Sequence, residues 1–347
     1  MSTPPLLAAL RGEQPSRRPV WYMRQAGRSL PEYRAARAGT SMLDACLDPE
    51  LAAEITCQPV RRYDVDAAIF FSDIVVPIRL AGVDVSIVPG VGPVVQHPVR
   101  SKADVAALPP LDPEALRPVG DGVRNAVAQL GDVPLIGFAG APFTVASYLV
   151  EGGPDRALPR TKALLAEEPE TWHRLLSWVA DVCAAFLVAQ VEAGAQAVQL
   201  FDSWAGRLGP AQYRSAAQRH SAAVLAAIGD LEPSKRVPRI HFGTGTKDLL
   251  PDMLAAGADV MGVASDLGLD EANSLLGGRV PLQGNLDPAL LSADPSTLDA
   301  AVRDVVRRGA SAPGHVFNLG HGVPPDTDPA TLARVTDLVH SIPFEEN

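Results

Sequence analysis

The stretch Val133-Pro134-Leu135-Ile136-Gly137-Phe138-Ala139-Gly140-Ala141-Pro142-Phe143-Thr144-Val145-Ala146-Ser147-Tyr148 contains one complete strand-and-helix unit. Residues 133–138 form a short apolar run, which is typical of a strand buried on both faces. A turn rich in small residues follows, and from residue 143 the apolar positions take helical spacing. A strand followed directly by a helix is the repeating unit of folds built on a parallel sheet.

Similar units recur along the chain of 347 residues. Short apolar runs occupy residues 19–23, 67–71, 133–138, 197–201, 239–242, 258–263, 279–282 and 315–319. Three of the intervening helical patterns begin with a capping aspartate followed by proline, at Asp48, Asp294 and Asp328, and Pro59 should end or kink the first of them. This alternation predicts an α/β fold, a single closed (β/α)8 or TIM barrel. An open doubly wound sheet is disfavoured because no Gly-x-Gly-x-x-Gly turn follows any run.

Residues 83–99 interrupt the alternation. Two β-branched runs flank Pro89-Gly90 there, which predicts a β-hairpin inserted after the second strand. Residues 1–18 are expected to form a flexible N-terminal segment. The sequence has no internal repeat or interdomain linker, so residues 1–347 are interpreted as one domain.

Composition excludes several functions. The formal net charge of −10 argues against nucleic-acid binding, which needs a basic face. Cys46, Cys57 and Cys183 have neither disulfide nor metal-ligand spacing, which predicts reduced, buried thiols and no metal site. No signal peptide is evident, and the most apolar helical stretch, residues 179–191, is too short to span a membrane. We therefore expect a soluble, cytoplasmic protein without a membrane partner.

Polar side chains follow the predicted strands, at the end of a barrel where its chemistry takes place. Arg24 and Arg28 follow the first run, within a group of six arginines and one carboxylate between residues 17 and 37. Guanidinium groups suit bidentate capture of carboxylate or phosphate, so these arginines predict an anionic ligand.

Three further residues near strand ends are candidates for the same site. Asp73 follows the second run, Tyr148 lies in the helical pattern after the third, and His321 lies between glycines after the last. Each also has an ordinary explanation: Asp73 as a helix cap, Tyr148 as core and His321 as a loop residue. No zinc, nucleophile-elbow or phosphate-loop motif occurs, and a cofactor-free mechanism is the simplest interpretation.

Longer segments resemble the uroporphyrinogen decarboxylase family. Its N-terminal signature is similar to Pro19-Val20-Trp21-Tyr22-Met23-Arg24-Gln25-Ala26-Gly27-Arg28-Ser29-Leu30-Pro31-Glu32-Tyr33, its second signature to Gly137-Phe138-Ala139-Gly140-Ala141-Pro142-Phe143-Thr144 with Tyr148 and Glu151-Gly152-Gly153, and further segments to residues 70–74, 201–206 and 318–322. The chain departs from the family at Ser29, usually tyrosine, and at residues 263–265, usually a Leu-Asp-Trp-like segment.

The resemblance implies a homodimeric barrel that needs no cofactor or metal. It implies decarboxylation of the four acetate side chains of uroporphyrinogen III, which gives coproporphyrinogen III for haem biosynthesis. By resemblance, the substrate-binding residues are Arg24, Gln25, Ala26, Gly27, Arg28, Asp73, Tyr148, Phe201, Ser203 and His321, and Asp73 and Arg24 are also catalytic.

Asp73 is an anion in a site for a polyanion, and the chemistry gives it a role. A pyrrole protonated on carbon is transiently cationic, and a central carboxylate stabilises that cation. Arg24 is one candidate proton donor, but guanidinium is a poor acid, so a bound water or a substrate carboxyl is an alternative.

Two other functions are alternatives. A corrinoid-linked methyltransferase of the same superfamily would need zinc held by His and Cys at the barrel end, whereas all three cysteines lie in helical patterns. A non-catalytic tetrapyrrole carrier would keep Arg24 and Arg28 but would not need Asp73.

Overall fold

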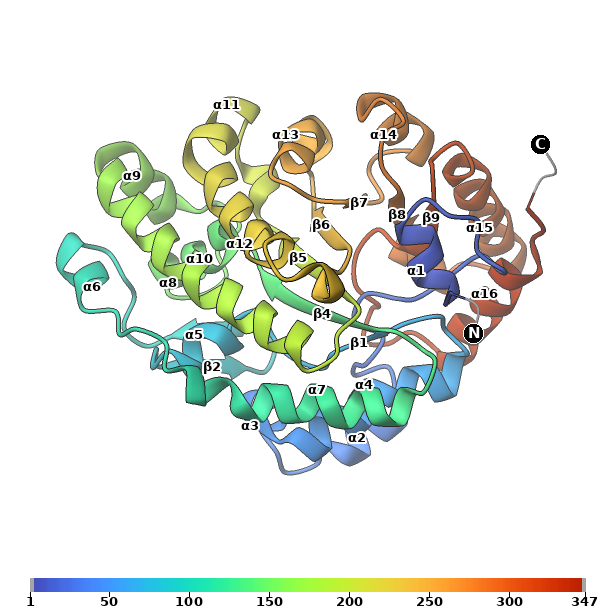
Figure 1. Cartoon of the computed structure of the whole chain (residues 1–347), viewed down its shortest axis with the longest axis horizontal. Helices are drawn as coiled ribbons and strands as arrows, with labels where there is room; N and C mark the ends of the chain where they lie inside the picture. The colour runs from blue at the N-terminus through green and yellow to red at the C-terminus, as the bar shows by residue number, and fades with distance from the viewer. Residues whose placement is uncertain (1–2, 345–347) are drawn as a thin grey trace.

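A computed structural model describes residues 3–344 of the chain. Seven parallel strands form one curved sheet in the order β1-β4-β5-β6-β7-β8-β9. The strands are β1 (Ala68–Ile69), β4 (Leu135–Gly140), β5 (Ala197–Asp202), β6 (Arg239–Gly243), β7 (Val260–Gly262), β8 (Leu282–Leu286) and β9 (His315–Leu319). Strands adjacent in the sheet follow one another in the chain, and the helices that connect them surround the sheet (Figure 1).

Residues 19–23 complete the ring between β9 and β1. Val20 forms an isolated parallel bridge with Phe317, and the backbone N–H of Asp66, just before β1, donates to the carbonyl of Val20. The predicted TIM-barrel fold is confirmed, but the first of its predicted strands is reduced to a bridge. The chain leaves strand geometry at Arg24, which adopts a left-handed backbone conformation with φ 61°.

Helices cover the outside of the sheet. They are α2 (Pro31–Ala36), α3 (Met42–Leu47), α4 (Pro49–Tyr63), α5 (Val76–Leu80), α6 (Lys102–Ala106), α7 (Arg117–Leu130), α8 (Pro142–Glu151), α9 (Pro159–Glu167), α10 (Pro169–Glu192), α11 (Pro210–Tyr213), α12 (Arg219–Gly229), α13 (Leu250–Ala255), α14 (Leu269–Leu275), α15 (Pro295–Gly309) and α16 (Pro329–Ser341). Asp48, Asp294 and Asp328 accept backbone N–H groups at the starts of α4, α15 and α16, as predicted. Pro59 lies inside α4 but does not end it, because the helix continues to Tyr63.

The predicted hairpin is present. Strands β2 (Val85–Val88) and β3 (Gly92–Val95) pair antiparallel, with Val85 opposite Val95. Gly90 in the connection has φ 78°, a conformation that favours glycine.

The N-terminal segment differs from its prediction. Residues 5–10 form helix α1 (Pro5–Leu10), in which Leu6, Leu7, Ala8, Ala9 and Leu10 are buried. The helix packs against β9, beside the C-terminal part of the chain (Figure 1). The expectation of flexibility is therefore wrong for these six residues, since their apolar side chains have a partner surface.

Strand β8 lies further along the chain than predicted, at Leu282–Leu286 instead of residues 279–282. Its polar residues face partners: Gln283 accepts from Trp21 Nε1 at 3.0 Å and donates to Gln199 Oε1 at 2.9 Å. An apolar pattern misses such a strand, because its amides satisfy one another in the barrel.

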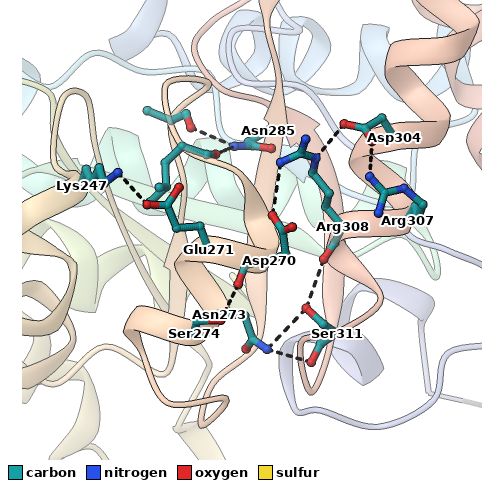
Figure 2. Close-up of polar contacts among 12 residues, drawn as sticks. Lys247, Asp270, Glu271, Asn273, Ser274, Asn285, Asp304, Arg307, Arg308 and Ser311 are labelled. Carbon is teal, nitrogen blue, oxygen red and sulfur yellow. Dashed lines mark hydrogen bonds and ion pairs between the residues drawn. The ribbon is translucent and has the colours of Figure 1, made fainter.

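Asn285 connects β8 to the loop after β7. Its Nδ2 donates to the carbonyls of Ala264 at 2.9 Å and Leu267 at 2.6 Å (Figure 2). On the outer surface nearby, Arg308 of α15 pairs with Asp270 of α14 at 3.3 Å. The segment between β7 and β8 is thus held to β8 by the bonds of Asn285 and to α15 by the Arg308–Asp270 ion pair.

Helix α10 is longer than the predicted stretch. Its 24 residues make it the one helix within residues 3–344 that is long and apolar enough to cross a membrane. It packs against α8, α12 and β4, and large side chains such as Trp172 and Phe186 are buried. We identify α10 as a core helix on grounds of packing, not length.

Candidate active site

The predicted site residues come from five places in the barrel. Arg24 follows residues 19–23, Asp73 follows β1, and Ser203 follows β5. His321 follows β9, and Tyr148 lies on α8, which starts at the end of β4. Because all the strands are parallel, these positions lie at the same end of the barrel.

A dense set of hydrogen bonds holds the turn around Arg24. The backbone N–H of Met23 donates to Asn318 Oδ1 at 3.0 Å, and Val323 N–H donates to the Met23 carbonyl at 2.8 Å. Gln25 Oε1 accepts from Tyr22 N–H at 2.9 Å. These bonds stabilise the left-handed conformation of Arg24, whose side chain is exposed.

Gln25 does not present its side chain to a ligand. It is 0% exposed, and its Nε2 donates to the carbonyl of Ala67 at 3.0 Å while its Oε1 is engaged by Tyr22. The side-chain amide of Gln25 is therefore engaged within the protein at both ends, and substrate binding by Gln25 stays a prediction. Gln25 instead connects the Arg24 turn to the start of β1.

Backbone N–H groups add partial positive charge beside the guanidinium groups of this turn. Within residues 3–344, the N–H groups of Ala26, Gly27 and Arg28 have no hydrogen-bond partner. Successive free amides beside guanidinium groups suit an anionic ligand. Ser29, the first departure from the family pattern, is buried next to them.

Gly322, which follows β9, leaves room for the side chain of Arg24. A Cβ atom on Gly322 would lie 2.5 Å from Arg24 Cδ, so a larger residue would displace the arginine. Arg24 thus lies against the segment that carries His321.

Asp73 is a helix cap, as one of its two interpretations predicts. Its Oδ1 accepts from Val75 N–H at 3.0 Å, so it caps the turn before α5, and its side chain is only half-buried. Burial raises the pKa of the Asp73 carboxyl, while the Val75 N–H and the Arg24 charge oppose that rise.

The charges of Asp73 and Arg24 act on the pKa of other predicted site residues. The pKa of Tyr148 is raised to about 12 by burial and further by Asp73, and is lowered by Arg24. Burial and the Arg24 charge both lower the pKa of His321. At neutral pH Tyr148 is therefore a hydroxyl donor.

Aromatic rings pack on one another close to the predicted site residues, and we call this group the aromatic wall. The Tyr148 and Trp204 rings lie 4.4 Å apart, and Phe201 packs edge-on against Phe138 at 5.4 Å and Phe242 at 6.0 Å. Phe201 and Ser203 are half-buried, so both remain reachable. An apolar wall with polar and cationic groups at its edge suits a large ring that carries anionic substituents.

The second departure from the family also lies at this end of the barrel. Ser265 is so close to the last strand end that a Cβ on Gly320 would lie 2.3 Å from its backbone nitrogen. Asn285 fixes this loop through Ala264 and Leu267. Sequence reasoning identified neither Asn285 nor Asn318 as a supporting residue. Asn318 lies within a family-like segment, which was an available signal.

The residues within 3–344 contain no cluster of three or more His, Cys, Asp or Glu side chains poised for a metal. Cys46, Cys57 and Cys183 are free and buried in α3, α4 and α10. The His and Cys ligand set expected of the methyltransferase alternative is thus not assembled.

Comparison with known sequences decides the family. The sequence model described as "Uroporphyrinogen decarboxylase (URO-D)" matches residues 1–342. The chain belongs to the uroporphyrinogen decarboxylase family. A relative from Arthrobacter sp. (strain FB24), named uroporphyrinogen decarboxylase, is 61% identical over 338 residues, which cover 97% of each chain. A relative of the same name from Rhodococcus erythropolis is 57% identical over 343 residues, covering 97% of this chain and 96% of that one.

Solved structures share the fold of this uroporphyrinogen decarboxylase family member. A methyltransferase from Methanosarcina mazei superposes with a TM-score of 0.80 at 20% identity, covering 96% of both chains. A B12-independent methionine synthase from Shewanella has a TM-score of 0.54 at 11% identity, covering 84% of this chain and 87% of that chain. At such identities the likeness concerns the barrel alone.

Proposed function

We propose that this chain converts uroporphyrinogen III to coproporphyrinogen III by removing carbon dioxide from its four acetate side chains, without a cofactor. The observation that carries the proposal is that Arg24 and Asp73 follow neighbouring strand positions, residues 19–23 and β1, at the same end of the barrel in a protein of this family. A cationic turn explains binding of a polycarboxylate, and a carboxylate at the next strand end explains a reaction.

Substrate binding uses the cationic turn and the polar groups around the aromatic wall. Arg24, Arg28 and the free amides of residues 26–28 receive substrate carboxylates. Tyr148, as a hydroxyl, donates to another carboxylate, and Ser203 and His321 do so from their strand ends. Phe201 contacts the macrocycle.

Asp73 acts on the reacting pyrrole. Its carboxylate accepts hydrogen bonds from the pyrrole N–H groups and stabilises the positive charge that develops when a ring carbon is protonated. When the carbon–carbon bond to the carboxylate breaks, carbon dioxide leaves and the bonding electron pair stays behind, where the cationic ring takes it up. Opposite charges about 4 Å apart interact by roughly 4 kcal/mol at an effective dielectric near 20, and each ~1.4 kcal/mol is tenfold in rate.

The proton that replaces carbon dioxide has more than one possible source. Arg24 lies in the correct region, but guanidinium is a weak acid. A bound water or a substrate carboxyl can donate this proton without deprotonation of a guanidinium group.

Assembly, location and domain organisation belong to the same proposal. One continuous hydrophobic core unites the described residues, which supports a single domain. We expect a homodimer in the cytoplasm, in keeping with the family, with no nucleic-acid or membrane partner.

An anaerobic product assay tests the function. Purified protein, uroporphyrinogen III and a reductant, with chelator in place of metal, should yield coproporphyrinogen III by chromatography. Recovery of substrate with all eight carboxyl groups would reject the enzyme and leave the tetrapyrrole carrier. Methyl transfer to a corrinoid would instead support the methyltransferase alternative.

A further inference from the structure

A second group of polar residues lies behind the site, where α8 meets the end of β5. Asp202 and Thr144 are both 0% exposed. The Thr144 hydroxyl donates to Asp202 Oδ1 at 2.7 Å and accepts from the backbone N–H of Trp204 at 3.2 Å. A carboxyl group is costly to bury without donors, so this bond constrains where Thr144 lies.

Helical spacing connects this bond to the site. Thr144 and Tyr148 are four residues apart on α8, which places their side chains on the same side of the helix. The Tyr148 ring in turn packs against the Trp204 ring at 4.4 Å. Trp204 is therefore held through its backbone by Thr144 and through its ring by Tyr148.

Ser203, between Asp202 and Trp204, is fixed by the loop after β6. Its carbonyl accepts from the Thr244 hydroxyl at 2.6 Å. A Cβ atom on Gly206 would lie 2.3 Å from the Thr244 carbonyl oxygen, so the chain after β5 packs tightly on the loop after β6. Ser203 and Tyr148 consequently keep a defined position relative to one another.

We propose that Asp202, acting through the Thr144 hydroxyl, is a positioning residue that holds Tyr148 and Ser203 where they receive the substrate. The inference rests on the proposed function, which assigns those two residues to substrate binding. Neither Asp202 nor Thr144 touches the substrate. Their effect follows from geometry, because a misplacement of about 1 Å can cost about 100-fold in rate.

Two matched variants separate positioning from packing. Thr144→Val keeps the shape of the side chain and removes the hydroxyl, whereas Thr144→Ser keeps the hydroxyl and removes a methyl group. We expect kcat/KM to fall about 10- to 100-fold in the valine variant and to stay within about threefold in the serine variant. A packing role gives the reverse order, because serine leaves a cavity and valine does not. That reverse order, or equal activities, would overturn the proposal.

A spectroscopic readout does not depend on turnover. The near-ultraviolet circular dichroism of the Tyr148–Trp204 pair, identified by its loss in Trp204→Phe, should change in Thr144→Val and persist in Thr144→Ser. If the parent protein forms no coproporphyrinogen, the proposed function fails while this comparison still tests the positioning. An unchanged spectrum in the valine variant contradicts the proposal.

Substitutions at Asp202 provide the second pair. Asp202→Asn retains an oxygen that accepts from Thr144 and should stay within about threefold of parent kcat/KM. Asp202→Leu removes it and should behave as Thr144→Val does. Parent-like activity and spectrum in the leucine variant would overturn the proposal even if the valine variant does not fold.

Discussion

At the residue scale, the site combines charges that a binding protein alone would not need. Arg24 has a left-handed backbone held by Asn318 and Gln25. Its charge opposes the rise that burial causes in the pKa of Asp73 and Tyr148, and it adds to the lowering of the pKa of His321. Asp73 opposes the electrostatic preference of the site for anions. We interpret this opposition as the difference between holding a polycarboxylate and decarboxylating it.

The role of Asp73 leads to a prediction about turnover. Asp73→Asn keeps an oxygen that can accept from Val75 N–H, so the local fold should persist. Without the negative charge, kcat should fall by about 100-fold or more, with KM changed only a few-fold. Steady-state kinetics of the purified variant measure both constants.

Arg28→Ala is the matched comparison, because it removes a binding charge and leaves the carboxylate. It should raise KM about tenfold or more and affect kcat less. Equal effects of the two substitutions on kcat would contradict the separate roles of Asp73 and Arg28.

At the element scale, the Thr144–Asp202 hydrogen bond joins helix α8 to strand β5. Thr144 lies in the first turn of α8, so Asp202 places a carboxyl group at the N-terminus of that helix. Burial raises the pKa of Asp202 to about 7 and lowers that of His241, whose Nε2 lies 3.9 Å from Asp202 Oδ2, to about 4. The two groups therefore form no ion pair at neutral pH.

These opposite shifts predict a pH dependence of stability. The folded-state pKa of Asp202 is raised from 3.8 to about 7, so its contribution is fully present below pH about 4 and is lost as pH rises to about 7. Asp202→Asn removes this dependence. The stability of the parent relative to the variant should fall by about 1 kcal/mol per pH unit across that window.

Urea unfolding between pH 4 and pH 8 measures the difference. His241 contributes the opposite slope, but it is present in both proteins and cancels to first order. Asp326→Asn, at an exposed position, is the control and should show no comparable slope. A pH-independent difference for Asp202→Asn would contradict a carboxyl group that is neutral below pH 7.

The elements also show where sequence reasoning succeeds. Aspartate-proline starts identified α4, α15 and α16, because the capping bonds are local. Sequence reasoning failed for α1, because this helix is too short to show periodicity and is stabilised by packing on β9. It misplaced β8, because Gln283 is polar yet buried among partners from distant strands. Sequence reasoning also missed the bond from the Gln25 side chain to Ala67, because that bond depends on tertiary structure.

At the scale of the whole molecule, the barrel is closed by few interactions. Residues 19–23 contribute one bridge to β9, one backbone bond from Asp66 and the two bonds of Met23 to Asn318 and Val323. The side chain of Asp66 adds three contacts: its Oδ2 accepts from Val20 N–H at 2.8 Å and lies 2.8 Å from His340 Nε2, and its Oδ1 accepts from Arg17 Nε at 2.7 Å. One buried carboxylate thus joins the N-terminal segment, the first strand position and α16.

Asp66→Ala should consequently destabilise the whole barrel and not one element. It leaves the buried Val20 N–H without an acceptor, takes the carboxylate away from His340 and leaves Arg17 with Asp64 alone, and we expect a loss of about 3–5 kcal/mol in the free energy of unfolding. Asp48→Ala, which removes an exposed cap of α4, should cost only about 1 kcal/mol. Urea denaturation of both variants provides the comparison. Equal losses would mean that the bridge and backbone bonds of residues 19–23 close the barrel without help from Asp66.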